Sequence, residues 1–171
     1  MKMKVNRRML ALLGGDVEFY QPSSVAMPDS LRAVATSGFK EVDGCVVSSS
    51  FTGTIIWSSA RPRILNTDDE TGFECSLSKI HVEDYFETNI GAIELARTGV
   101  DFAFLLGTEL LKTGIGGDFR IIVSMHVADH EMNVKETCTV RYHKMREGQI
   151  WLDDDLEAYK HEAIAALDFA G

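Results

Sequence analysis

The stretch FRIIVSMHV at residues 119–127, followed by TCTVRYHKM at residues 137–145, decides the fold class. In the first stretch every second residue is apolar, so four of them share one face of an extended chain: Phe119, Ile121, Val123 and Met125. The second stretch alternates in the same way, with Cys138, Val140 and Tyr142 on one face. The polar residues 128–136 between the two suit a hairpin tip. The pattern predicts two neighbouring antiparallel strands.

Residues 42–80 continue the β pattern towards the N-terminus. Short runs such as Cys45–Val47, Thr54–Trp57 and Phe73–Leu77 are rich in β-branched, aromatic or apolar residues, and serine, glycine or proline separates them. The connections are too short for helical crossovers, so we expect an antiparallel meander. Residues 66–72 read as an exposed loop within it.

Helical spacing follows between residues 82 and 112. Four residues recur at a 4-3-4 spacing, namely Phe86, Ile90, Ile93 and Arg97, and Thr98-Gly99 is expected to break the run. Residues 100–111 are apolar almost all round, which predicts a buried central helix, although residues 102–106 also fit a buried strand. Two further short helices are expected at residues 5–13 and 29–36, where Gly14 and Gly38 are placed to end them.

The C-terminal segment shows an apolar stripe at a 4-3-4-4 spacing: Leu152, Leu156, Tyr159, Ala163 and Leu167. Asp153, Asp154 and Asp155 fall in the first turn of this stripe, as suits a helix N-terminus. We therefore expect a helix over residues 152–168. The complete prediction is one α+β domain over residues 1–171, in which an antiparallel sheet from residues 42–80 and 119–145 is packed by helices at 82–112 and 152–168.

Composition places the chain among ordinary globular proteins, with 45% hydrophobic and 25% charged residues. The three cysteines are far apart, which argues against a disulfide scaffold and predicts reduced, buried thiols. The apolar run at residues 9–13 is too short for a secretory leader, and no stretch reaches the ~18 apolar residues of a membrane span. We expect a cytoplasmic protein without a membrane anchor.

The formal net charge of −9 is unevenly distributed. Residues 66–94 hold eight acidic residues against Lys79, and residues 146–171 hold seven against Arg146 and Lys160, whereas residues 1–8 hold four basic residues. Such a field repels nucleic-acid phosphate and attracts cationic surfaces. Nucleic acid is therefore not an expected partner, except at the basic N-terminal tip. The alternative is that both acidic segments are solvated faces that keep the protein in solution.

The acidic segments suggest a protein-interaction module that covers a basic partner surface, as an inhibitor or a toxin-neutralising immunity protein does. The residues expected to bind the partner are Asp153, Asp154, Asp155, Glu157, Trp151, Asp68, Asp69 and Glu70. A homo-oligomer is left open, and no cofactor is expected.

Two other functions stay open. One is a small-molecule binding or sensory domain with an apolar pocket near Phe102, Phe104 or Met125. The other is a metal-dependent enzyme that uses His126 and His130. On a strand these histidines stand about 13 Å apart, too far to share one ion, unless a hairpin brings Cys138 opposite His126. No motif identifies catalytic residues, and Gly114–Gly117 reads as a turn rather than a phosphate loop.

Overall fold

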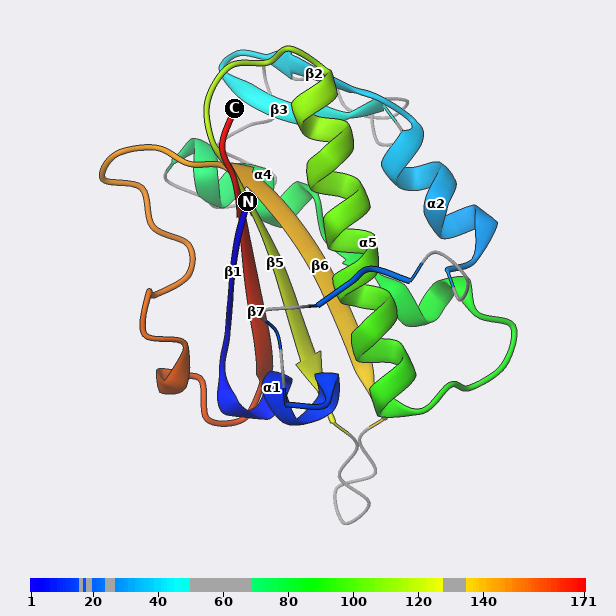
Figure 1. The fold of residues 1–171 in the computed structure, drawn as a ribbon. Helices are drawn as coiled ribbons and strands as arrows, with labels where there is room; N and C mark the ends of the chain where they lie inside the picture. Colours follow the sequence, from blue (N-terminus) through cyan, green and yellow to red (C-terminus); the bar gives the residue numbers. More distant parts are fainter. Residues whose placement is uncertain (16, 18–19, 24–26, 50–68, 128–134) are drawn as a thin grey trace.

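The computed structural model describes residues 1–171 except 16, 18–19, 24–26, 50–68 and 128–134 (Figure 1). The described strands form a five-stranded antiparallel sheet in the order β1-β7-β5-β6-β4 and a separate two-stranded sheet, β2-β3. The five strands are β1 (Lys2–Val5), β7 (Ala163–Phe169), β5 (Phe119–His126), β6 (Thr137–Lys144) and β4 (Ile80–His81); the two are β2 (Phe39–Val42) and β3 (Cys45–Ser48). The α+β prediction is confirmed.

The described helices are α1 (Arg7–Leu13), α2 (Asp29–Thr36), α4 (Glu70–Leu77) and α5 (Ala92–Lys112), with short 3-10 turns η2 (Val82–Tyr85) and η3 (Leu156–Ala158). The expected helices at 5–13 and 29–36 are confirmed as α1 and α2. Gly14 and Gly38 follow them with positive φ angles of 97° and 88°, which a glycine adopts without strain. Within the described ranges, no helix combines the length and the apolar composition that crossing a membrane requires.

The predicted strand pair is confirmed as β5 and β6. The two strands pair along their whole length, with Val123 opposite Val140 and Arg120 opposite His143. The apolar faces predicted from the alternation point to the same side, where they are fully buried. We call this side of the five-stranded sheet the inner face.

Helix α5 covers the inner face, with α1 and α2 beside it (Figure 1). The expected break at Thr98-Gly99 is wrong, because α5 continues through it. The glycines of α5 allow close approach instead: a Cβ on Gly99 would meet Sγ of Cys138, and one on Gly107 would meet the ring of Phe169. The helix expected from residue 82 begins only at Ala92, after η2 and residues 86–91, which belong to neither a helix nor a strand.

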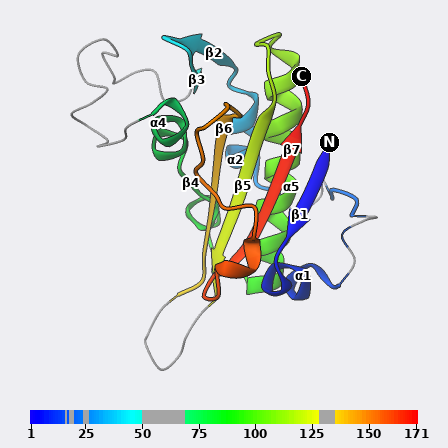
Figure 2. The ribbon, with the colours of Figure 1, turned by 90° about the vertical axis from the view of Figure 1, so that its left-hand side faces the viewer.

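The opposite side, the outer face, carries α4 and the segment 145–162 (Figure 2). A second, smaller apolar cluster lies there: Cys75, Ile122, Leu152, Leu156, Ile164 and Ala166. This layer positions the candidate site described below.

The C-terminal helix predicted over residues 152–168 is wrong. Only Leu156–Ala158 form a short 3-10 turn, and Ala163–Phe169 is the strand β7 between β1 and β5. A central strand packed on both faces is apolar at nearly every position, and residues 163–167 are all buried. Such a run also contains apolar residues at helical spacing, so the stripe did not distinguish a buried strand from an amphipathic helix.

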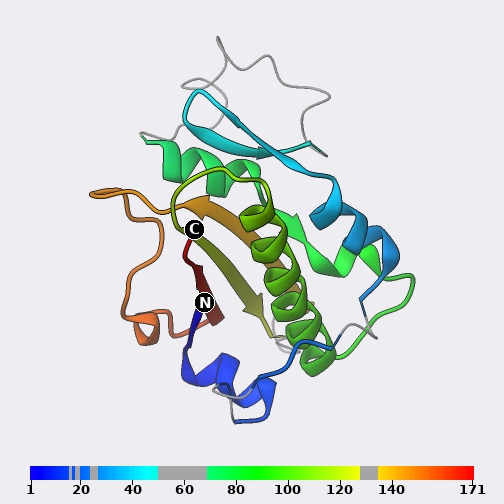
Figure 3. The same ribbon diagram turned by 45° about the horizontal axis from the view of Figure 1, so that its top comes forward.

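The meander predicted over residues 42–80 needs correction too. Phe73–Leu77 lies in the helix α4, which begins where Oδ1 of Asp69 accepts a hydrogen bond of 2.7 Å from the backbone N of Gly72. Residues 69–72 are therefore a helix start, with Thr71 and Gly72 buried, rather than an exposed loop. The β2-β3 hairpin turns at Asp43-Gly44 and lies beside α4 (Figure 3). The strand expected at 54–57 falls outside the described residues.

Candidate functional site

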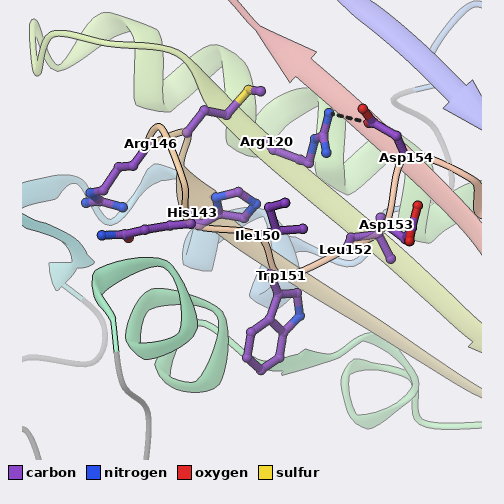
Figure 4. Close-up of a pocket in the computed structure, with 10 residues that line it drawn as sticks. Arg120, His143, Arg146, Ile150, Trp151, Leu152, Asp153 and Asp154 are labelled. Atoms are coloured by element: carbon purple, nitrogen blue, oxygen red, sulfur yellow. Dashed lines mark ion pairs between the residues drawn. The ribbon is translucent and has the colours of Figure 1, made fainter.

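A pocket of about 440 Å³ lies on the outer face, where the loop of residues 145–155 passes over the ends of β5 and β6. Its floor is polar and comes from the strands, whereas its lip comes from the loop and combines apolar with polar or charged side chains (Figure 4). The lining residues on which the argument rests are Arg120, His143, Arg146, Ile150, Trp151 and Asp154. We call this site the outer-face pocket.

Arg120 forms one wall of the outer-face pocket. It lies between β6 and β7, and its Nε and Nη2 donate to the two carboxylate oxygens of Asp168 at 2.7 and 3.0 Å. Asp154, in the loop above, is 3.6 Å from Nη2 and also accepts a 3.1 Å bond from Lys4. The charge of Arg120 is thus balanced by two carboxylates, and its bond to Asp168 raises the pKa of Arg120.

Arg146 forms the opposite side and fixes α4 to the pocket. Its Nη1 and Nη2 each donate to a carboxylate oxygen of Glu74 at 2.8 Å. The Glu74 carboxylate is fully buried and also accepts backbone N–H bonds from Val46 and Lys144. One carboxylate therefore joins α4, β3, β6 and the start of the 145–155 loop, and it balances the charge of Arg146.

His143 lies at the centre of the pocket, between Arg146 and Ile150 (Figure 4). The residue is 4% exposed, and its Nδ1 is 3.0 Å from the carbonyl oxygen of Lys144. Its Nε2 is buried and has no hydrogen-bond partner in the described part of the chain. Burial lowers the pKa of His143, and the bond to Lys144 opposes that shift only in part.

Arg141 lies two residues before His143 on β6, on the same face of the strand. Its guanidinium carbon is 6.0 Å from the ring centre of Trp151, which lines the outer-face pocket, in a cation–π arrangement. The Nε of Arg141 is buried and lacks a hydrogen-bond partner among the residues described.

The predicted partner-binding acids of the C-terminal segment lie along the outer face, and each makes contacts within the chain. Asp153 and Asp155 accept backbone N–H bonds from Asp155 and Glu157, and Glu157 accepts one from Arg7. Asp154 is paired with Lys4 and Arg120, which lower its pKa. Lys4 and Arg7 thus lie next to this acidic segment, and whether the segment binds a partner stays a prediction.

The acids predicted from residues 68–70 are at the start of α4. Asp68 falls outside the described residues, and Asp69 caps the helix. Glu70 accepts a 2.7 Å bond from Nε2 of Gln149, whose Oε1 accepts from the backbone N of Thr71. These bonds bring the start of α4 next to the 145–155 loop, so the two acidic segments meet there.

The histidines of the metal hypothesis are not gathered into a site. His126 lies at the end of β5 with Nε2 at 3.5 Å from Glu162, and His130 falls outside the described residues. Cys138 is opposite Met125, not His126, and is buried on the inner face. Across the described ranges, no three His, Cys, Asp or Glu side chains are placed to hold a metal ion.

The residues named for an apolar pocket lie mostly in the packed core. Phe102 and Met125 are fully buried, while Phe104 lines a shallow groove of about 270 Å³ beside α5. Asp101 lies in the same groove, and accepts hydrogen bonds from the Tyr20 hydroxyl at 2.8 Å and the Ser23 backbone N at 3.0 Å. These bonds fasten residues 20–23 to α5.

Arg120 and His143, the strand residues that line the outer-face pocket, were not predicted as a site. A signal for this face was available in the sequence, because Arg120, Arg141 and His143 occupy the strand positions that alternate with the buried apolar ones. Three basic or titratable side chains on the same face of two paired strands are a candidate site in their own right.

The fold and the pocket define an α+β protein with a five-stranded antiparallel sheet, one face closed by a long helix and the other carrying a polar pocket under a loop. The chain belongs to the Uncharacterized protein PM0498 family, whose model matches residues 4–170. The matched range starts within β1 and ends after β7, so it includes every strand of the main sheet except the first two residues of β1. Neither a curated protein nor a solved structure matches the chain.

Proposed function

We propose that this chain is a small-molecule binding protein whose site is the outer-face pocket. The observation that carries the proposal is His143, which lines the pocket and keeps Nε2 buried without a partner among the described residues. An unsatisfied buried polar atom costs about 1–3 kcal/mol. A bound molecule that hydrogen-bonds this atom would recover that free energy.

The shape and the chemistry of the pocket support the same function. About 440 Å³ lies within the range of sites that hold small organic molecules. The strands supply polar groups that orient a ligand, and the loop supplies Ile150, Trp151 and Leu152, which can cover its apolar part. This pocket replaces the apolar pocket expected near Phe102.

A screen of a fragment library of mixed charge, followed by amide chemical shifts, tests the proposal. We expect hits that perturb residues 141–154 together. The pair Ile150→Ala and Ile93→Ala gives a matched control, because both isoleucines are exposed but Ile93 lies on α5, the helix that covers the other face of the sheet. The hits should bind several-fold more weakly to Ile150→Ala than to the wild type, and Ile93→Ala should bind them as tightly as the wild type does. A library that yields no hit at residues 141–154 would refute this function.

A second candidate is the protein-interaction module predicted from the acidic segments. The loop exposes 80% of Ile150 and 39% of Trp151, and aromatic residues of this kind anchor protein interfaces. Asp153 and Asp155 lie beside them, and the bonds described for their carboxylates come from backbone N–H groups rather than basic side chains. Their charge is therefore available to a basic partner that also offers an apolar contact.

Affinity capture from native lysate at low and high salt tests this second candidate. A basic partner protein should bind to the captured chain at low salt and elute at high salt. The double variant Asp153→Asn/Asp155→Asn should retain less of this partner. The charge-matched control is Asp29→Asn/Glu94→Gln, at exposed positions on α2 and α5, and should retain it fully. Equal retention by both double variants would show that the loop carboxylates do not recognise the partner.

A further inference from the structure

Residues 150–154 pass over two side chains of β6, and we call these residues the lid. Ile150 lies beside the His143 ring (Figure 4), and the ring of Trp151 has its centre 6.0 Å from the guanidinium carbon of Arg141. In the described ranges, Nε2 of His143 and Nε of Arg141 are the two buried side-chain nitrogens without a hydrogen-bond partner. The closed lid therefore lies over two polar atoms that reach neither a partner nor water.

Few bonds hold the lid in place. Within the described part of the chain, no backbone group of the lid is bonded to another backbone group. The backbone N of Asp153 donates to the Tyr159 hydroxyl at 3.0 Å, and Leu152 packs into the smaller apolar cluster. The side chain of Asp154 is 75% exposed, and ion pairs at such a position add little stability. A segment held in this way opens locally at a small cost in free energy.

The neutral ring of His143 suits the closed lid, and the protonated ring does not. A carbonyl oxygen only accepts, so the bond to Lys144 places a proton on Nδ1 and leaves a lone pair on Nε2. Protonation would add an N–H at Nε2 and a positive charge, and no acceptor for this N–H is within reach among the residues described. A buried charge and a buried donor without an acceptor both cost free energy, and water removes this cost once the lid is open.

We propose that residues 150–154 are a pH-sensitive lid, which is closed over the neutral ring of His143 and opens when that ring takes up a proton. Opening exposes Nε2 of His143 and Nε of Arg141 to solvent. The lid operates without a ligand. The inference goes beyond the proposed function, because it states when the polar atoms beneath the lid become accessible.

Charged groups from several elements line the pocket or act on the His143 ring: Glu74 from α4, Arg120 from β5, Arg141 from β6, and Arg146, Asp153 and Asp154 from the loop after β6. Burial lowers the pKa of His143 below its ordinary value of 6.5 and outweighs the opposing effects of the Lys144 carbonyl and Glu74. In the open state water surrounds the ring, so its pKa returns to the ordinary value. The open state thus binds more protons, and the open fraction rises as the pH falls below about 6.5.

Relaxation-dispersion NMR of the full chain without a ligand tests the lid, because it detects opening on the microsecond-to-millisecond timescale. The amides of residues 150–154 and the indole N–H of Trp151 are followed. We expect the open fraction to rise by a factor of about three to ten as the pH falls from about 7.5 to about 5.5, since one proton is taken up. His143→Gln should abolish this rise because its side chain does not titrate. His161→Gln, at an exposed histidine that does not line the pocket, is the control and should keep the rise.

Two results would overturn the inference: an open fraction that is undetectable or unchanged over this pH range in the wild type, and a rise that persists in His143→Gln. If His143→Gln alters the fold, the ring of the wild type gives a second measurement. Nε2 should gain its proton in step with the opening of the lid, and a ring that is protonated while the lid stays closed also overturns the inference. None of these results decides the small-molecule function, which the fragment screen tests.

Discussion

Arg146 donates a hydrogen bond of 2.8 Å to each carboxylate oxygen of Glu74, in a contact that leaves the Glu74 side chain fully buried. The same carboxylate accepts from the backbone N–H groups of Val46 and Lys144. The pair therefore ties the β2-β3 hairpin, α4 and the end of β6 together, and sets where the loop over the outer-face pocket begins.

Removal of that carboxylate should be strongly destabilising. Glu74→Ala leaves a partly buried guanidinium and two backbone donors without their acceptor, so we expect a loss of about 3–5 kcal/mol in the free energy of unfolding. Urea denaturation measures it. Glu147→Ala, at an exposed position of the nearby loop, is the control and should change stability by less than about 0.5 kcal/mol. Similar values for both variants would show that the Glu74 contacts do not hold the outer layer together.

The closeness of α5 to the sheet predicts a second result. A Cβ at position 107 would overlap the ring of Phe169, so Gly107→Ala should destabilise the protein by about 1–3 kcal/mol despite the better helix propensity of alanine. Gly116→Ala is the matched control, since nothing lies near its Cβ position. Phe169→Leu combined with Gly107→Ala should recover part of the loss, and a fully additive double variant would argue against this contact.

The third prediction concerns Asp101 on α5. Burial raises its pKa above the ordinary value of 3.8, and the bonds from Tyr20 and Ser23 oppose this only in part. The folded protein thus holds the Asp101 proton more tightly than the unfolded chain does. That contribution to stability is fully present below pH 3.8 and is lost as the pH rises through the pKa in the folded state.

Asp101→Asn removes this titration. The stability of the wild type minus that of Asp101→Asn should therefore fall as the pH rises from about 4 to about 7, as urea denaturation at each pH would show. A difference that stays constant or rises over this range contradicts the assignment. Tyr20→Phe should cost about 1–3 kcal/mol at pH 7, because the hydroxyl donates to a charged acceptor.

The parts of the fold that were predictable from sequence are those set by local patterns. Alternation placed β5 and β6, and glycines with positive φ ended α1 and α2 where expected. The Asp43-Gly44 pair is the usual signal of a tight hairpin turn, and it does close β2-β3. Each of these signals lies within a few residues of the element that it specifies.

The errors arose where distant partners decide the structure. Ala163–Phe169 carries alanines that favour a helix in isolation, yet it pairs with β1 and β5, which lie at the other end and in the middle of the chain. Tertiary pairing overrides the helix propensity of a short segment. The start of α4 was misjudged for a related reason, because its buried Glu74 is compensated by Arg146, 72 residues away.

The outer-face pocket was only partly predictable. The polar positions of β5 and β6 mark a face, and Trp151 was singled out as a possible contact residue. What alternation does not reveal is that residues 145–155 fold back over that face and enclose His143. The unpartnered Nε2 of His143 follows from this enclosure, so it emerges only in three dimensions.

The most direct test of the proposed function follows the His143 ring by long-range ¹H–¹⁵N correlation spectra of the imidazole during titration with a hit from the fragment screen. In the free protein at neutral pH we expect a neutral ring with its proton on Nδ1, which bonds the Lys144 carbonyl oxygen, and an Nε2 without a partner in the described part of the chain. Saturation with the hit should form a hydrogen bond at Nε2 and shift the Nε2 resonance. An Nε2 resonance that stays unchanged in the saturated complex would contradict the claim that this atom binds the ligand.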